Sequence, residues 1–326
     1  MIALFLATLF VTNERAGTIT AIDTKTDKVI ATKTIGNRPR GIVVSPDGRR
    51  IYVAVSLWQS GAARFSAPKA GGLKPAAPRE AIVALDAAKL EEIREYRSGT
   101  DPEVVTVSPD GKRLYMSNED AGNASVVDVK TGKRLATLVV GTEPEGVTVS
   151  PDGKTAYVAC ESSNVITVID TRVPKVVANI LVDPRPRATI FSADGKRAWV
   201  TSEVGSAIAS IDPATRRITK RVHFGGMIRP VGMALSPDEK RLYVATGRGN
   251  AILVVDPATL RVTRSIAVGS RPWYIALAEH GRKLYVANNL SNTISVIDTA
   301  TLRVVRTIPG GDGPWGIAVA IPRAAP

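Results

Sequence analysis

The chain repeats itself with a period of about 42 residues, and this period constrains the fold more than any other feature. An apolar stretch ending in aspartate recurs seven times, at spacings of 63, 42, 42, 42, 44 and 42 residues, and a proline before an apolar run recurs at identical spacings. The aspartates are Asp23, Asp86, Asp128, Asp170, Asp212, Asp256 and Asp298, and the prolines are Pro39, Pro102, Pro144, Pro186, Pro230, Pro272 and Pro314. Because two independent markers keep the same spacing, the chain is a tandem array of seven units.

Each unit predicts four short β-strands. In the unit that starts at Pro144, strands are predicted at 146–149, 156–160, 165–169 and 176–182. The first two are separated by a Ser-Pro-Asp-Gly turn, in which proline presets φ and glycine accepts a positive φ. Units of four strands at this period predict an all-β fold, a seven-bladed β-propeller.

The two ends of the chain predict how the ring closes. The N-terminal part supplies only three strands, Phe10–Asn13, Ile19–Ile22 and Val29–Ile35, and the C-terminal part supplies one, Gly316–Ala320. Together they complete the last blade, and this pairing hides both free edges of the array. The sequence therefore predicts a single propeller domain over 1–326.

Two segments depart from the regular repeat. Residues 2–11 form an apolar run that is too short to span a membrane. No basic residue precedes the run and no clear cleavage motif follows it, so 1–9 is predicted as a leader, the remnant of a signal peptide, or as part of the first strand. Residues 57–79 are rich in alanine, glycine and proline and make one unit 21 residues longer than 42. They are predicted to form an insertion loop between the second and third strands of one blade.

The second and third strands resemble the repeats of the YVTN-type seven-bladed propeller family. The resemblance rests on Tyr157-Val158-Ala159, on 285–288 (Tyr-Val-Ala-Asn) and on third strands ending in Val-Ile-Asp. The segments 268–273, 291–298 and 313–316 are most similar to propellers associated with PQQ-dependent catabolism of alcohols. That resemblance implies an exported protein, periplasmic or secreted. It also implies a non-catalytic ligand- or protein-binding role, accessory to that pathway. The expected partner is a quinoprotein dehydrogenase, a transporter component or a small molecule.

Strand directions predict where a ligand site lies. The loops around the repeated prolines and the ends of the second strands share one face of the ring, which we call the mouth face, and the insertion loop 57–79 lies there too. The Ser-Pro-Asp-Gly turns lie on the opposite face. The candidate ligand-binding residues at the mouth are Glu14, Arg38, Arg40, Glu103, Glu119, Glu145, Glu161, Arg187, Glu203, Arg271, Trp273 and Trp315. Convergent charges between aromatic walls are typical of a binding site. The alternative is that arginine and glutamate only pair with each other and hold the blades in register.

The composition narrows the chemistry. One cysteine (Cys160) and two histidines (His223 and His280) exclude a multi-cysteine or histidine-rich metal centre. Cys160 is predicted to be a buried, inert thiol, and His223 is a weak candidate for a base or ligand. No catalytic residue is assigned and no cofactor is predicted. The glutamates leave open a metal-dependent hydrolase or lactonase-like enzyme, in which Ca²⁺ or Mg²⁺ would be the cation.

The net charge of +13 leaves a third alternative, sequence-nonspecific binding of nucleic acid. Many of the basic residues map to the turns opposite the mouth and to the outer strands, where lysine and arginine also protect exposed edges. Aromatic residues make up only 5% of the chain, so no platform for stacking bases is evident. Nucleic acid is therefore the less favoured partner.

Overall fold

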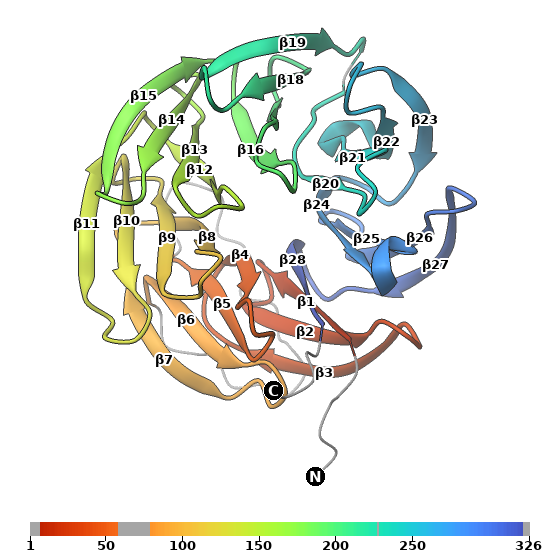
Figure 1. The fold of residues 1–326 in the computed structure, drawn as a ribbon. Coiled ribbons are helices and arrows are strands. Elements are labelled where there is room, and N and C mark those ends of the chain that lie inside the picture. Colours follow the sequence, from red (N-terminus) through yellow and green to blue (C-terminus); the bar gives the residue numbers. More distant parts are fainter. Residues whose placement is uncertain (1–6, 58–78, 227, 322–326) are drawn as a thin grey trace.

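The computed structural model describes residues 7–57, 79–226 and 228–321. They form seven four-stranded antiparallel sheets arranged as a closed ring (Figure 1). The predicted all-β, seven-bladed propeller is thus confirmed. Most of the predicted leader 1–9 and nearly all of the insertion 57–79 lie outside the described residues.

The blades are numbered along the chain, each from its inner to its outer strand. Blade 1 is β4 (Pro39–Val44), β5 (Arg50–Val55), β6 (Ala81–Asp86) and β7 (Glu92–Arg97); blade 2 is β8 (Pro102–Val107), β9 (Arg113–Asn118), β10 (Asn123–Asp128) and β11 (Arg134–Val139). Blade 3 is β12 (Pro144–Val149), β13 (Thr155–Cys160), β14 (Val165–Asp170) and β15 (Lys175–Leu181); blade 4 is β16 (Pro186–Phe191), β17 (Ala198–Ser202), β18 (Ala207–Asp212) and β19 (Arg217–His223).

Blade 5 is β20 (Met233–Leu235), β21 (Leu242–Ala245), β22 (Ala251–Val255) and β23 (Val262–Ala267); blade 6 is β24 (Pro272–Ala278), β25 (Lys283–Asn288), β26 (Thr293–Asp298) and β27 (Arg303–Pro309). Blade 7 joins β28 (Pro314–Ala320) to β1 (Thr8–Asn13), β2 (Thr18–Asp23) and β3 (Lys28–Thr34). The predicted closure by three N-terminal strands and one C-terminal strand is confirmed, because β28 pairs with β1 over Thr8↔Ala320 to Asn13↔Pro314. Two short 3₁₀ helices, η1 (Gly247–Gly249) and η2 (Glu279–Gly281), lie in loops, and no helix in the described part of the chain meets the length and hydropathy of a membrane-spanning helix.

The core lies between neighbouring blades, where the apolar faces of adjacent sheets pack on each other. Tyr157 of blade 3 packs on Phe191 of blade 4 with ring centroids 4.7 Å apart, and Trp199 is fully buried between blades 4 and 5. The inner strands approach each other closely at the mouth face. A Cβ on Gly146 would lie 2.2 Å from the carbonyl oxygen of Arg187, so only glycine fits there.

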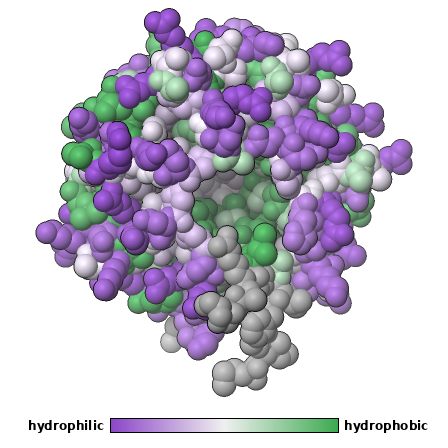
Figure 2. Space-filling view, viewed as in Figure 1, coloured by the Kyte–Doolittle hydropathy of each residue, from purple (hydrophilic) through white to green (hydrophobic). Residues whose placement is uncertain are grey.

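The centre of the ring is open on the face seen in Figure 2. The figure shows a central depression with hydrophobic side chains inside a largely hydrophilic rim. Partly exposed apolar residues on the inner strands, among them Val44, Val149 and Leu277, fit this apolar character. The inner strands therefore bring residues from all seven blades close to one axis, and the loops at their ends can build a common site.

Candidate functional site: the channel mouth

One local motif builds the mouth in most blades. The residue after the second strand donates its backbone N–H to the carbonyl of the residue before the repeated proline, as Glu119 does to Asp101 and Glu161 to Glu143, both at 2.8 Å. The residue before the proline has a positive φ, 50° at Asp101 and 51° at Glu143, which is uncommon outside glycine. This hydrogen bond holds the residue after the proline beside the residue after the second strand.

Each blade thus presents two positions at the mouth, one after the proline and one beyond the second strand; in blade 5 the second position is a glycine, two residues beyond the end of β21. In order from blade 1 to blade 7 the pairs are Arg40 and Ser56, Glu103 and Glu119, Glu145 and Glu161, Arg187 and Glu203, Val231 and Gly247, Trp273 and Asn289, and Trp315 and Glu14. Blades 2 and 3 are the two that present pairs of carboxyl groups. They lie next to each other in the ring (Figure 1).

The two carboxyl pairs differ in protonation. Carboxyl oxygens of Glu103 and Glu119 lie within 4.8 Å of each other, and burial together with the charges of Glu103 and Glu145 raises the pKa of Glu119 to about 10. In blade 3, burial and the Glu145 charge raise the pKa of Glu161 to about 7. Burial alone would raise the pKa of Glu145 too, but the positive charges of Arg187, then Arg40, hold it below its usual range. Glu119 is therefore protonated at neutral pH, whereas Glu161 is partly protonated and partly ionised.

Arginines from the flanking blades neutralise most of these carboxylates. Arg187 of blade 4 reaches Glu145 at 2.8 Å and Glu203 at 2.7 Å, and it also forms an ion pair with Glu161. Its side chain is 6% exposed, and the Glu145 side chain is 1% exposed. The pairs with Glu145 and Glu161 cross the boundary between blades 3 and 4, so the alternative that such pairs hold the blades in register has structural support.

A similar set joins blades 7, 1 and 2. Arg38 lies 2.5 Å from Asp101 and 3.1 Å from Glu103, and Arg40 bridges Glu14, at 3.2 Å, and Glu103. Glu103 is completely buried. Two guanidinium groups therefore serve one buried carboxylate on this side of the mouth.

Aromatic side chains form the opposite wall. Trp273 and Trp315 lie with ring centroids 6.2 Å apart, and Tyr274 packs on Trp315 at 4.7 Å. Arg187 lies 5.3 Å and Arg271 4.6 Å from the centroid of Trp273, distances typical of cation–π contacts. The buried tryptophans close the mouth between blades 6 and 7.

The structure places all twelve predicted residues on the mouth face. Each of them takes part in an ion pair, a contact between carboxyl groups or a ring contact described above; Arg271 does so only through Trp273, and it forms no ion pair with a described carboxylate. The set of predicted ligand-binding residues left out Asp101 and Arg185, although both precede a repeated proline and lie at the mouth. It also missed Tyr274, which stands where four other blades have glycine. That departure from the repeat was the available signal.

Three carboxylates fit a cation only in part. Oxygens of Asp101, Glu103 and Glu119 lie within 4.8 Å of one another, and hard cations such as Ca²⁺ and Mg²⁺ prefer oxygen ligands. However, Arg38 already pairs with Asp101 and Glu103, and Glu119 holds a proton at neutral pH. A cation would have to displace both, so these residues fit a metal poorly as they stand and we derive no chemical step from one.

The two weaker candidates lie elsewhere. His223 ends the outer strand β19, with its Nε2 2.9 Å from Asp183 and 60% of its side chain exposed. This partner fixes it at the rim of blade 4, away from the carboxyl pairs. Cys160 is fully buried and unpaired, and burial raises the pKa of its thiol, which agrees with the predicted inert role.

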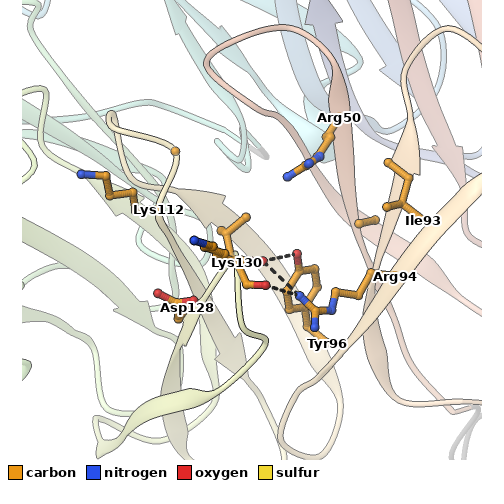
Figure 3. Close-up of a pocket in the computed structure, with 10 residues that line it drawn as sticks. Arg50, Ile93, Arg94, Tyr96, Lys112, Asp128 and Lys130 are labelled. Atoms are coloured by element: carbon orange, nitrogen blue, oxygen red, sulfur yellow. Dashed lines mark hydrogen bonds between the residues drawn. The ribbon is translucent and has the colours of Figure 1, made fainter.

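A separate cavity of about 460 Å³ lies in the furrow between blades 1 and 2 (Figure 3). Its lining includes four basic residues, Arg50, Arg94, Lys112 and Lys130, and one carboxylate, Asp128. Arg94 donates hydrogen bonds to the carbonyls of Lys130 and Thr131 at 2.7 and 3.0 Å, which ties the two blades together. The lining does not include the carboxyl pairs, so the cavity is distinct from the mouth.

Comparisons with known proteins support the fold and correct the predicted role. Residues 241–321 match the model of the YNCE-like beta-propeller family. No curated protein matches the chain significantly in sequence. Among solved structures, the chain is similar to Kuenenia stuttgartiensis hydrazine synthase, with a TM-score of 0.76, 23% identity and coverage of 90% of this chain and 92% of that chain.

Two further similar structures are named as enzymes. The periplasmic gluconolactonase PpgL of Pseudomonas aeruginosa has a TM-score of 0.78, 20% identity and coverage of 98% of this chain and 99% of that chain. The dihydro-heme d1 dehydrogenase NirN has a TM-score of 0.71, 17% identity and coverage of 99% of this chain and 76% of that chain. At these identities the likeness establishes the fold alone.

The prediction of a non-catalytic accessory propeller was wrong, because these three similar structures are named as enzymes. The gluconolactonase agrees better with the lactonase-like alternative. The association with PQQ-dependent catabolism receives no support from these three structures. The match over 241–321 and the seven-bladed ring agree with the predicted resemblance: the chain is a seven-bladed β-propeller whose residues 241–321 are similar to the YNCE-like beta-propeller family.

Proposed function

We propose that the chain is a hydrolase of the lactonase type whose site is the channel mouth. The observation that carries this proposal is the pair of carboxyl dyads on blades 2 and 3, Glu103 with Glu119 and Glu145 with Glu161, in which burial and the charge of one carboxylate raise the pKa of the other. Two carboxyl groups whose environments separate their pKa values are typical of acid–base catalysis. The similarity to a gluconolactonase agrees with this assignment.

The two groups have complementary roles in opening a cyclic ester. Glu161, whose pKa is about 7, accepts a proton from a water molecule as the water oxygen attacks the lactone carbonyl carbon. The bond between that carbon and the ring oxygen then breaks. Glu119, whose pKa is about 10, donates its proton to the departing ring oxygen, giving a hydroxy acid. One water is consumed, and solvent restores both protonation states.

Arginines at the site suit the charge that develops on the carbonyl oxygen. Arg185 lies 2.5 Å from Glu161 and is 46% exposed, so its guanidinium faces both the proposed base and solvent. A donor fixed before the reaction stabilises an oxyanion without reorganisation. We assign Arg185 to this role and Arg187, buried behind it, to positioning the carboxylates.

The proposal is tested by measuring proton release from a panel of lactones, including δ-gluconolactone and simple aliphatic lactones, with correction for spontaneous hydrolysis. The wild-type chain should accelerate at least one of them. Glu161→Gln and Glu119→Gln should each lower kcat by about 10²-fold or more, the range for loss of general acid–base catalysis. Glu91→Gln is the matched control, because Glu91 is exposed on blade 1.

The result is decisive in either direction. Activity that survives both substitutions in the dyads would show that the site lies elsewhere, and no acceleration of any lactone would refute the assignment. The export of the protein stays a prediction and is tested separately, by fractionating cells that express the full chain.

A further inference from the structure

The side of the mouth formed by blades 5 and 6 contains hydrogen-bond donors that lack acceptors. The Nε1 of Trp273 is buried and has no hydrogen-bond partner among the described residues. The guanidinium of Arg271 stacks on the same indole, 4.6 Å from its centroid, and forms no ion pair with any described carboxylate. A buried donor without a partner costs free energy, so such a cluster calls for an explanation.

Arg271 differs from the other mouth arginines in its electrostatic surroundings. Arg38, Arg40 and Arg187 each face two or more carboxylates, and those carboxylates raise their pKa values. Burial lowers the pKa of Arg271, and the positive charges of Arg187 and Arg248 act in the same direction, although Glu203 and Glu14 oppose them. The charge of Arg271 is therefore incompletely compensated within the protein.

A second arginine lies close to this cluster. Arg248 is exposed in η1, three residues beyond the end of the second strand of blade 5, and its charge acts on Arg271. The carbonyl of Asn250 accepts a hydrogen bond from Val268, and its side chain accepts one from the backbone of Arg271 at 2.9 Å. The loop that carries Arg248 is thus fixed against the start of blade 6.

The opposite side of the mouth has the reverse shortage. The Oε1 atoms of Glu103 and Glu145 lie within ion-pair distance of Arg38 and Arg187, but neither receives a hydrogen bond of good geometry. Acceptors are in excess on blades 2 and 3, and donors are in excess on blades 5 and 6. Hydrogen-bond donors and acceptors are therefore unevenly distributed across the mouth. The donor-rich side on blades 5 and 6 suits a ligand group that accepts hydrogen bonds.

We propose that Arg271, with Arg248 beside it, forms a subsite for an anionic group, a carboxylate or a phosphate, on the substrate. This inference rests on the proposed function, because it orients that substrate with its anion on blades 5 and 6 and its ester toward the carboxyl dyads. Guanidinium groups pair well with both oxyanions. The substrate class is then a lactone that carries an acidic substituent.

Binding and turnover test this subsite separately. Sodium phosphate and sodium gluconate are titrated into the wild-type chain, with tryptophan fluorescence and calorimetry as readouts, because Trp273 contacts Arg271. Saturable binding is expected for at least one of them, and Arg271→Leu should raise its Kd by about tenfold or more, as expected for loss of a charged hydrogen bond. Arg303→Leu removes the same charge from the exposed outer strand β27 and should leave Kd unchanged.

The two probes distinguish the sources of the anion: preference for phosphate indicates a phosphorylated ligand, and preference for gluconate indicates a carboxylated one. No saturable binding of either probe, or equal loss of binding in Arg303→Leu, would overturn the subsite. Turnover of neutral lactones as efficient as that of acidic ones would overturn it while leaving the lactonase assignment intact. Binding lost only in Arg271→Leu, without turnover of any lactone, would support the subsite and refute the lactonase assignment.

Discussion

Removal of Arg187 is the most demanding test of how the mouth is held together. This guanidinium pairs with carboxylates from two blades, Glu145, Glu161 and Glu203, whose side chains are 1%, 3% and 10% exposed. Arg187→Met keeps much of the side-chain volume and removes the charge. Leaving buried charges without a partner costs about 3–5 kcal/mol in comparable cases, and we expect a loss of that size in the free energy of unfolding at pH 7.

The pH dependence follows from the sign of the shift. Arg187 is the main group that keeps the pKa of Glu145 below its usual range, although burial opposes it. A lowered pKa stabilises the folded state above the unfolded pKa of the carboxyl group, and that stabilisation is lost as the pH falls through the folded value. Without Arg187 the folded protein binds protons more readily, so the difference between the variant and the wild-type chain should shrink as the pH falls toward 5.

Denaturant unfolding followed by circular dichroism at pH 7 and pH 5 measures both effects. Arg185→Met is the matched control, because this neighbouring guanidinium is 46% exposed and its loss should cost only about 0–1 kcal/mol. If Arg187→Met lowers the free energy of unfolding at pH 7 by less than about 1 kcal/mol, the view that these buried ion pairs stabilise the fold is refuted. An equal loss at both pH values would refute the electrostatic explanation.

Three further predictions concern activity and packing. The pH profile of kcat should be bell-shaped, rising as Glu161 loses its proton near pH 7 and falling as Glu119 loses its proton near pH 10; a profile without the lower limb would contradict the role of Glu161. Treatment with a chelator should leave lactone turnover unchanged, and loss of turnover that Ca²⁺ or Mg²⁺ restores would show that a cation displaces Arg38 from Asp101. Gly146→Ala should lower the melting temperature, with a cost of about 1–3 kcal/mol, because the added Cβ meets the adjacent inner strand at 2.2 Å; an unchanged melting curve would show that the strands can separate there.

The sequence predicted the fold well because each structural rule acts within one repeat. In the unit from Pro144, the predicted strands agree with β12 to β15 to within two residues at each boundary. The closing blade was predictable for the same reason, since a ring of four-stranded units leaves three strands at one end and one at the other. Repetition turned weak local signals into a firm pattern.

The positions of the mouth residues were predictable too, but not their partners. The repeat places one residue after each proline and one after each second strand, which was enough to find Glu103 and Glu119. Which carboxylate keeps a proton depends on burial and on charges from the neighbouring blades, and these are properties of the assembled ring. Tyr274 shows the other limit: its ring packs on Trp315 from the next blade, a contact between residues 41 positions apart.

The distribution of charge at the mouth bears on why these residues are there. A network that served only to hold blades in register would be expected to pair its charges, because unpaired buried groups cost stability. Here Glu119 keeps a proton because it is buried beside other carboxyl groups, while Arg271 forms no ion pair with a described carboxylate. Moving one of the surplus carboxylates to the blade 6 side would satisfy both. Since the surplus groups stand on opposite sides instead, stability alone does not explain the arrangement, whereas a ligand whose anionic group lies beside Arg271 supplies the partner that this guanidinium lacks.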